Sequence, residues 1–509
     1  MIGLSRVQRL RPPAGIPALF AAAYVGSALA FAPDWTVDDA FVVQRYAERW
    51  VAGLGLTFRE GPPTDGVTAP LWLALVAVAR GLGLPGLATS KVVGVLAVAL
   101  AVHAVVADLR RRIGGRSAAL FAGFLLVPQA PLALAGTAGL STGLATLAAT
   151  RAGLAATRRP GPRFLELGLA VGALAWMRPE LAPAMGALLV LGSLRRPRPA
   201  WRAWALALAG SLGVLLYREA VFGHPLPLAL SAKPAELANG LPYLTGGLAL
   251  TTGGGGILLA ALGARLGRGE DLGIGAALVA HAVAVVLAGG DWMPGLRLLA
   301  PMLPLYAHLS GTGAFRACLV LRRRKGDAGS ADPREDRRRR PGPGPSTAAL
   351  VLVAGLALGL PPLAWWAARP DARAGAVARR RDGDAVAAAL AGTAGGPVAL
   401  VDVGWLVHRA GLDDVVDLGG ITDPEIARLA GGHLDKRLPE ALLRRRAPTV
   451  IVLHSKSPPV FDEEGRLLHF RGHPVEHRVA AMPWVRRRFR VASVHPYGDA
   501  RFYVVLRRR

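Results

Sequence analysis

Apolar blocks alternate with short, Arg-rich stretches along the first two thirds of the chain. Each block has about the length of a bilayer span, for which about 20 apolar residues suffice. This alternation predicts a mainly α, polytopic transmembrane helix bundle rather than a soluble domain. The predicted spans are residues 14–32, 88–107, 117–135, 141–157, 164–177, 180–194, 203–217, 248–264, 272–288, 297–316 and 347–367.

The Arg-rich stretches predict how the bundle is oriented, because cytoplasmic loops carry an excess of Lys and Arg. Placing all of them in the cytoplasm requires the apolar segment 68–84, which contains Arg80, to lie in the interface or re-enter. About eleven spans then remain in the inner (cytoplasmic) membrane, and the C-terminal part lies outside. The stretches are residues 1–11, 108–116, 158–163, 195–202, 265–268 and 321–340.

The residues after about 368 follow a different pattern. Short β-like runs at 397–404, 449–454 and 501–508 alternate with helical stretches, which is typical of a small soluble α/β domain. The predicted organisation is a transmembrane module (1–320) whose first external loop is 33–67, a basic cytoplasmic linker (321–346), a last transmembrane helix (347–367) and an external, periplasmic α/β domain (368–509).

The first external loop begins with a predicted amphipathic helix that carries two adjacent carboxylates, Asp38 and Asp39. Apolar residues recur at helical spacing from position 42 to position 51, and glycines at 53 and 55 end the helix. Trp50 suits a membrane interface. The polar face consists of Gln44, Arg45, Glu48 and Arg49.

Two interpretations of this pair are open. An Asp at a helix start commonly caps the backbone N–H groups of its own helix, and Asp38 has that position. Alternatively, two close carboxylates raise each other's proton affinity, so that one serves as a general base. The same two side chains, Asp38 and Asp39, would also be the ligands of a divalent cation if the protein uses one.

Composition narrows the function classes. The formal net charge of +26 would suit nucleic acid, but no zinc-finger spacing, RNA-binding aromatic signature or basic heptad helix occurs, so no nucleic-acid partner is expected. The single cysteine, Cys318, excludes an intramolecular disulfide and a cysteine-only metal site. Arg clusters such as 486–488 suit anionic lipid headgroups or an acidic glycan, or are simply solvated.

Several segments, in order along the chain, resemble the GT-C class of polytopic glycosyltransferases. The nearest group includes the terminal arabinofuranosyltransferases of the mycobacterial cell wall. Val67, Leu228 and Ser141 depart from the pattern, which usually has Tyr, Asn and Glu at these places. The segments are Asp38-Asp39-Ala40-Phe41, Arg45-Tyr46, the run from Gly53 to Phe58, the run from Gly66 to Trp72, Arg178-Pro179-Glu180, 222–233, 289–305 and 415–427.

The resemblance implies an inverting glycosyltransferase that uses a polyprenyl-phosphate sugar donor, with arabinofuranose as the favoured sugar. Its acceptor would be a glycan or lipid of the cell envelope on the outer face, and membrane lipids are its other partners. Asp38 or Asp39 would be the catalytic base, and cationic side chains would stabilise the leaving phosphate. The implied donor- or substrate-binding residues are Arg45, Tyr46, Thr68, Arg178, Glu180, Lys233, Asp291 and Arg297.

Four of these residues also have a structural interpretation. Arg178 and Glu180 could form an ion pair in a solvated turn, Asp291 could cap a helix, and Lys233 could anchor the chain at the interface. The glycine run in 251–256 is expected at the start of a membrane helix.

Alternative functions are also open. A transporter or flippase of a lipid-linked or anionic solute would favour internal repeats and mid-membrane charges, and neither is evident. Because Ser141 stands where the pattern has Glu, an inactive scaffold of the same fold is the other alternative. His469, His473 and His477 have the spacing of metal ligands on a helix, but Gly472 and Pro474 predict that this segment is not helical.

Overall fold

The structure is a computed structural model. It describes residues 15–326 apart from 114–115, 159–162, 196, 234–236, 268, 270, 292 and 294, a few positions between 354 and 364, and residues 383–509 apart from 392–394 and 498–500. The predicted linker 321–346 lies outside the described residues except for its start, which continues helix α14 (Leu303–Gly326). The predicted last span, 347–367, lies almost wholly outside them.

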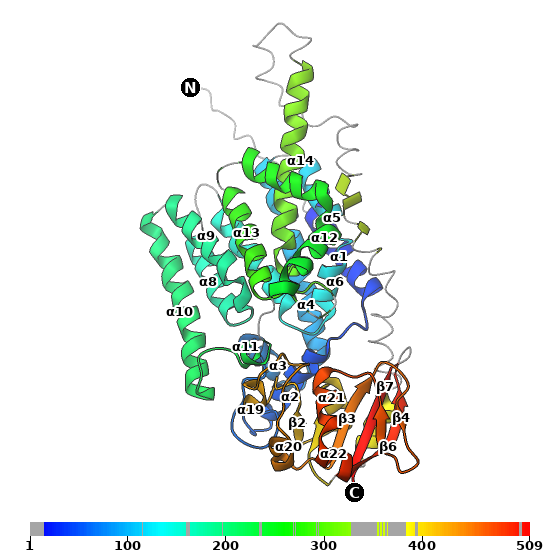
Figure 1. Ribbon diagram of the computed structural model, residues 1–509. Coiled ribbons are helices and arrows are strands. Elements are labelled where there is room, and N and C mark those ends of the chain that lie inside the picture. The colour runs from blue at the N-terminus through cyan, green and yellow to red at the C-terminus, as the bar shows by residue number, and fades with distance from the viewer. Residues whose placement is uncertain are drawn as a thin grey trace, which may run out of the picture.

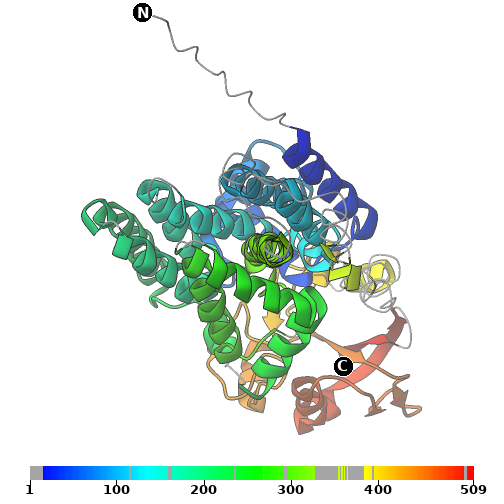
Figure 2. The same cartoon turned by 90° about the horizontal axis from the view of Figure 1, so that it is seen from above.

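The first two thirds of the chain form a helical bundle (Figure 1). Figure 2 views α14 nearly end-on, in the middle of this bundle. The other helices are α1 (Gly15–Phe31), α4 (Gly86–Ile113), α5 (Arg116–Leu126), α6 (Ala130–Thr137), α7 (Thr142–Ala156), α8 (Phe164–Ala175), α9 (Ala182–Arg195), α10 (Pro197–Phe222), α12 (Leu237–Leu266) and α13 (Asp271–Leu287), with short 3₁₀ turns η1 (Pro179–Leu181) and η2 (Ala300–Met302).

Small residues let these helices approach closely. A Cβ atom on Gly143 of α7 would lie 2.6 Å from the Gly94 carbonyl oxygen of α4. A Cβ atom on Gly210 of α10 would lie 2.4 Å from the Gly172 Cα atom of α8. Close backbone contact of this kind is how helices associate where lipid removes the hydrophobic driving force.

The predicted number of about eleven spans is not confirmed. Among the described residues, two helices, Gly86–Arg112 and Ala200–Phe222, are long and apolar enough to cross a bilayer, and two bent pairs would bring the number to four. The predicted spans rested on the number of apolar residues in each block, which does not show where a helix breaks within the block. The predicted span 117–135 bends by 62° between α5 and α6. The glycine run does not start a helix but bends α12, where Gly253 has φ 54°.

Two shorter helices lie beside the C-terminal domain at one end of the bundle: α2 (Asp38–Val51) and α3 (Pro70–Gly81) (Figure 1). The α3 helix has 12 residues and is therefore about 18 Å long, whereas the hydrocarbon core is about 30 Å thick. Helix α8, in the predicted span 164–177, also has 12 residues, so it stays a prediction that segment 68–84 does not cross. The far end of α14 lies at the opposite end of the bundle, and the sides of the membrane stay a prediction.

The C-terminal domain contains a five-stranded sheet in the order β2-β1-β3-β7-β6. The strands β1 (Val398–Leu400), β2 (Val415–Asp417) and β3 (Val450–Ser455) are parallel, while β6 (Phe489–Pro496) and β7 (Phe502–Arg508) add antiparallel pairs. The three predicted β runs are therefore strands. A hairpin and six helices complete the domain: β4 (Val460–Phe461), β5 (Leu467–His469), α17 (Gly383–Ala391), α18 (Trp405–Ala410), α19 (Pro424–Ala427), α20 (Glu440–Arg446), α21 (Pro474–Ala481) and α22 (Pro483–Arg488).

Candidate active site at the junction of the two domains

The amphipathic helix is present as α2, and Gly53 and Gly55 follow it with φ 76° and 81°. Its predicted polar face is wrong in part, because Gln44 and Arg45 are buried. The cause is tertiary: α2 contacts α3 and α4 of the bundle and also α18 of the C-terminal domain. The helix therefore lies between the two domains, covered on faces that the sequence pattern left to solvent.

Asp38 does not cap its own helix. The N-cap of α2 is Val37, and the Asp38 carboxylate instead accepts the backbone N–H groups of Gly404 (2.9 Å) and Trp405 (2.7 Å). These two residues begin α18, so Asp38 caps a helix that lies more than 360 residues away in the sequence. Gly404 has to be glycine for this contact, because a Cβ atom there would lie 2.2 Å from the Asp38 carbonyl oxygen. Asp38 is therefore a helix cap, as one interpretation predicted, but it caps α18 and not its own helix α2.

Asp39 faces a different group of side chains. Its Oδ2 atom lies 3.3 Å from Nη1 of Arg297, and its side chain is 25% exposed. Burial by itself raises the pKa of Asp39, but the positive charges of Lys233 and Arg297 outweigh it, so the pKa lies below the usual range. Asp39 is therefore a carboxylate at neutral pH, and two cations from other segments act on it.

The Arg297 side chain is held by the loop that carries it. Its Nε and Nη2 atoms bind the Asp291 carboxylate at 2.5 and 3.3 Å. That carboxylate also accepts the backbone N–H of Met293. Asp291 is not a helix cap, because α13 ends before it at Leu287 and the next helical turn begins only at Ala300.

Arg178 joins the same region from η1. Its guanidinium donates to Thr142 Oγ1 (2.7 Å) and the Arg297 carbonyl oxygen (3.5 Å), and it pairs with Glu180 at 3.0 Å. The predicted ion pair exists, but the Arg178 side chain is only 12% exposed, so this is not a solvated turn. Ser141 lies close by, with Oγ 3.5 Å from the Met177 carbonyl oxygen. The position at which the family pattern has Glu is thus adjacent to Thr142, which binds Arg178.

Comparison with solved structures identifies the fold. The crystal structure of ArnT from Cupriavidus metallidurans in the apo state matches with a TM-score of 0.59 and 16% identity, over 96% of this chain and 97% of that one. The structure of the same ArnT bound to undecaprenyl phosphate matches with a TM-score of 0.58 and 16% identity, over 97% and 98%. The chain has the fold of ArnT. The prediction of a mainly α membrane bundle with a C-terminal domain of strands and helices is confirmed at this level.

Other comparisons give no closer assignment. No protein-family model matches the chain, and no curated protein matches it. The likeness to ArnT does not confirm the resemblance to arabinofuranosyltransferases.

Three of the predicted site residues are not brought to Asp39. Arg45 donates to the carbonyl oxygens of Phe58 (2.6 Å) and Asp413 (3.0 Å). The Tyr46 hydroxyl lies 2.6 Å from Thr64 Oγ1. Thr68 offers its carbonyl oxygen to the Arg218 guanidinium at 2.8 Å. In this ArnT-like fold the three hold the first loop in shape, and a role in donor binding stays a prediction.

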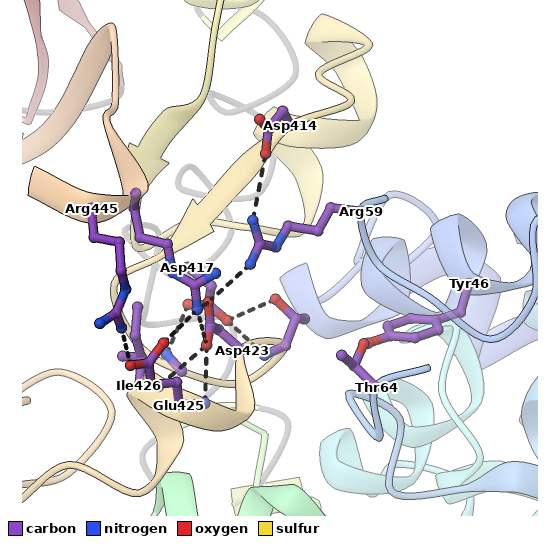
Figure 3. A network of polar contacts seen from close by, with 12 residues as sticks. Tyr46, Arg59, Thr64, Asp414, Asp417, Asp423, Glu425, Ile426 and Arg445 are labelled. Carbon is purple, nitrogen blue, oxygen red and sulfur yellow. Dashed lines mark hydrogen bonds and ion pairs between the residues drawn. The ribbon is translucent and has the colours of Figure 1, made fainter. Parts of the chain in front are cut away.

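Further ion pairs fasten the first loop to the C-terminal domain (Figure 3). Arg59 reaches from the loop to Asp414 and Asp423, each at 3.7 Å. Asp423 also caps α19 and binds Arg446 at 2.8 Å. The sequence contains these charges but no spacing that predicts their pairing, because the partners lie more than 350 residues apart.

The carboxylate pair does not form an open cation site, since Asp38 binds N–H donors and Asp39 binds Arg297. The three histidines at spacing four do not share a helix, as Gly472 and Pro474 predicted, because His469 lies in β5 and His473 is the N-cap of α21, which begins only at Pro474. Within the described residues, His454, His473 and Glu476 bring ligand atoms within 4.8 Å of one another.

That group is already satisfied without a metal. The two ring nitrogens of His454 lie 2.8 Å from Glu476 Oε1 and 2.7 Å from Asp402 Oδ2. These are direct hydrogen-bond distances, whereas two ligands of a tetrahedral metal with bonds of about 2.1 Å lie about 3.3 Å apart. The group is better described as an imidazolium held between two carboxylates.

Proposed function

We propose that this chain is a glycosyltransferase that moves a sugar from a polyprenyl-phosphate donor to a glycan or lipid acceptor. The observation that carries the proposal is the Asp39 carboxylate, accessible at the junction of the two domains and flanked by Arg297 and Lys233. The fold supports it, since ArnT with the same fold has been solved bound to undecaprenyl phosphate. Transfer on the outer face of the inner membrane is part of the proposal.

A cavity of about 1030 Å³ among α12, α13 and α14 supports a lipid-linked donor. Its lining is apolar, including Leu248, Ile257 and Leu303, and it also includes Leu299, two residues after Arg297. A mainly apolar space with Leu299, close in sequence to Arg297, in its wall suits a molecule with a prenyl chain and a phosphate. Such a cavity can hold the chain while the phosphate lies near Arg297.

The proposed chemistry follows from the charges. The Asp39 carboxylate takes the proton of the acceptor hydroxyl, and the hydroxyl oxygen attacks the anomeric carbon from the face opposite the phosphate. The bond from the anomeric carbon to the phosphate oxygen breaks, and polyprenyl phosphate leaves with the electron pair. Lys233 and Arg297 stabilise its negative charge. Because attack and departure are on opposite faces, the configuration at the anomeric carbon inverts.

The pairing with Arg297 also links the base strength of Asp39 to the binding of the donor. A carboxylate with a lowered pKa is a weak base when the site is empty. An anionic phosphate beside Lys233 and Arg297 offsets their charge and strengthens the base. The donor therefore prepares Asp39 for the acceptor. Arabinofuranose remains the sugar to test first.

The test is transfer of radiolabelled sugar from polyprenyl-phosphate donors, starting with arabinofuranose, to membrane glycan by the purified protein. Asp39→Asn is expected to lower transfer by about 10²- to 10⁴-fold, the usual contribution of a general base, while binding of undecaprenyl phosphate is kept. Glu60→Gln, an exposed acid of the same loop, is the matched control and should be unchanged.

Full activity of Asp39→Asn would show that a residue other than Asp39 is the general base. No transfer from any donor by the native protein would favour a transporter of lipid-linked solute or an inactive scaffold.

A further inference from the structure

The loop between α19 and α20 has a fixed backbone and carries His433. The Arg437 N–H donates to the Ala430 carbonyl oxygen at 2.9 Å, and the Asp435 N–H donates to the Gly432 carbonyl oxygen at 2.8 Å. Gly431 has φ +94°, and a Cβ atom there would lie 2.0 Å from the Asp435 carbonyl oxygen. The loop is therefore a defined structure, so the position of His433 is set by its neighbours.

Lys436 joins this loop to the helical bundle. The side chain is fully buried, and its ammonium group donates to the carbonyl oxygens of Ala427 (2.7 Å), Leu429 (3.0 Å) and Ser231 (3.3 Å). Ser231 belongs to α11 (Leu228–Ala232) of the bundle and precedes Lys233 by two residues. Side chains of Leu228, Ala232 and Ala427 pack together at the same place. Lys436 thus holds the loop against the segment that carries Lys233.

As a result, three side chains from distant segments act on one another. Asp39 is within electrostatic range of both Lys233 and His433. Burial and the positive charge of Lys233 lower the pKa of His433 to about 3. A neutral imidazole has one N–H donor and one acceptor nitrogen, and a sugar hydroxyl is likewise both donor and acceptor.

We propose that His433 binds the sugar acceptor by hydrogen-bonding one of its hydroxyl groups beside Asp39, so that the C-terminal loop completes the acceptor side of the site. This proposal rests on the proposed transferase function. The ligand class is a glycan or polyol with adjacent hydroxyl groups. Asp39 takes the proton of the attacking hydroxyl, and His433 orients the acceptor without exchanging a proton with it.

Cysteine labelling tests the location without requiring turnover. In a Cys318→Ser background, His433→Cys and Lys233→Cys are each treated with a water-soluble maleimide in detergent, with and without undecaprenyl phosphate together with an alkyl glycoside as the acceptor. We expect both positions to react and the two added ligands to slow each reaction at least fivefold. His469→Cys, on exposed β5, is the matched control and should react at the same rate in both conditions.

The outcomes separate the two proposals. Protection at Lys233→Cys without protection at His433→Cys overturns the role of His433 and leaves the donor proposal standing. No reaction at His433→Cys in either condition also overturns it, because the position would not be accessible from the site. Absence of protection at both positions contradicts the proposed donor.

Kinetics then test the role of the imidazole. For an alkyl glycoside on which the native protein is active, His433→Leu, which removes both the donor and the acceptor, should raise the acceptor KM at least tenfold. Hydrolysis of the donor by water and binding of undecaprenyl phosphate should stay within twofold of native. His433→Gln, which keeps a donor and an acceptor in its side-chain amide, should recover part of the loss. Equal losses of transfer and donor hydrolysis would show a general structural effect and overturn the proposal.

Discussion

The contact between Asp38 and the start of α18 predicts that this carboxylate holds the two domains together, whereas the neighbouring carboxylate does chemistry. Asp38 accepts two backbone N–H groups, at 2.9 and 2.7 Å. Hydrogen bonds to a charged acceptor contribute about 1.5–3 kcal/mol each, and loss of a helix cap costs about 0.5–2 kcal/mol. Because Asp38 is partly exposed, we expect Asp38→Ala to destabilise this contact by about 2 kcal/mol. Asp38→Asn keeps one acceptor oxygen and should cost about half of that.

Hydrogen exchange measures this contact where it occurs. A loss of about 2 kcal/mol corresponds to roughly 30-fold faster opening, so the amides of Gly404 and Trp405 should exchange about 30-fold faster in Asp38→Ala. Mass spectrometry of a peptide that spans residues 400–410 can resolve this change. Asp413→Asn is the control, because the Asp413 side chain is 88% exposed, and it should leave exchange unchanged.

Two results would refute the reasoning. Unchanged exchange in Asp38→Ala would mean that the carboxylate does not hold the start of α18. Loss of sugar transfer in Asp38→Asn with normal exchange would assign chemistry to Asp38 itself. The expected result is that Asp38→Asn keeps most of its transfer activity, in contrast to Asp39→Asn.

Three further predictions concern stability. Gly404→Ala places a Cβ atom 2.2 Å from the Asp38 carbonyl oxygen and should cost about 1–3 kcal/mol, whereas Gly395→Ala, with open space around its Cβ position, should leave the thermal midpoint unchanged. Arg218 and Asp65 form a buried ion pair at 2.9 Å, and both side chains are 2% exposed. Arg218→Met leaves the carboxylate unpaired and should therefore lower the free energy of unfolding by about 3–5 kcal/mol, measured by thermal unfolding. If the double variant with Asp65→Leu recovers none of this stability, the unpaired carboxylate is not the cause of the loss. Burial lowers the pKa of His454, but the carboxylates of Asp402 and Glu476 outweigh it, so the pKa lies well above 6.5. The stability that the imidazolium contributes is therefore full below about pH 6.5 and is lost as the pH rises through the folded pKa. In thermal scans between pH 6 and pH 9.5, the native protein should lose stability as the pH rises, and His454→Gln should not.

The sequence was informative about the site where residues belong to local motifs. Asp39, Arg178 and Arg297 were all identified from short segments, and the structure brings these three into one region. Asp291 was identified as well, and it supports the Arg297 side chain. Such residues are recognisable because each lies in a run of neighbours with a characteristic order.

The residues that the sequence did not single out lie outside the motifs. His433 and Lys436 are in a loop of the C-terminal domain with no distinctive spacing, and the buried pair of Asp65 and Arg218 joins residues 153 positions apart. A lysine in a loop is ordinarily a solvated charge. Only the carbonyl oxygens that surround Lys436 in the folded protein make its burial favourable.

The sequence by itself determined that the chain forms an apolar helical bundle, because the apolar blocks favour burial away from water and the Arg-rich stretches between them favour contact with it. It also determined the ends of α2 and the strands of the C-terminal domain, since these depend on local periodicity and on glycine. Tertiary structure alone decided what each carboxylate of the pair does. Asp38 and Asp39 are chemically identical neighbours, and a helix turns successive side chains by about 100°. One therefore meets the N-terminus of α18 and the other meets Arg297, and neither partner is near them in the sequence.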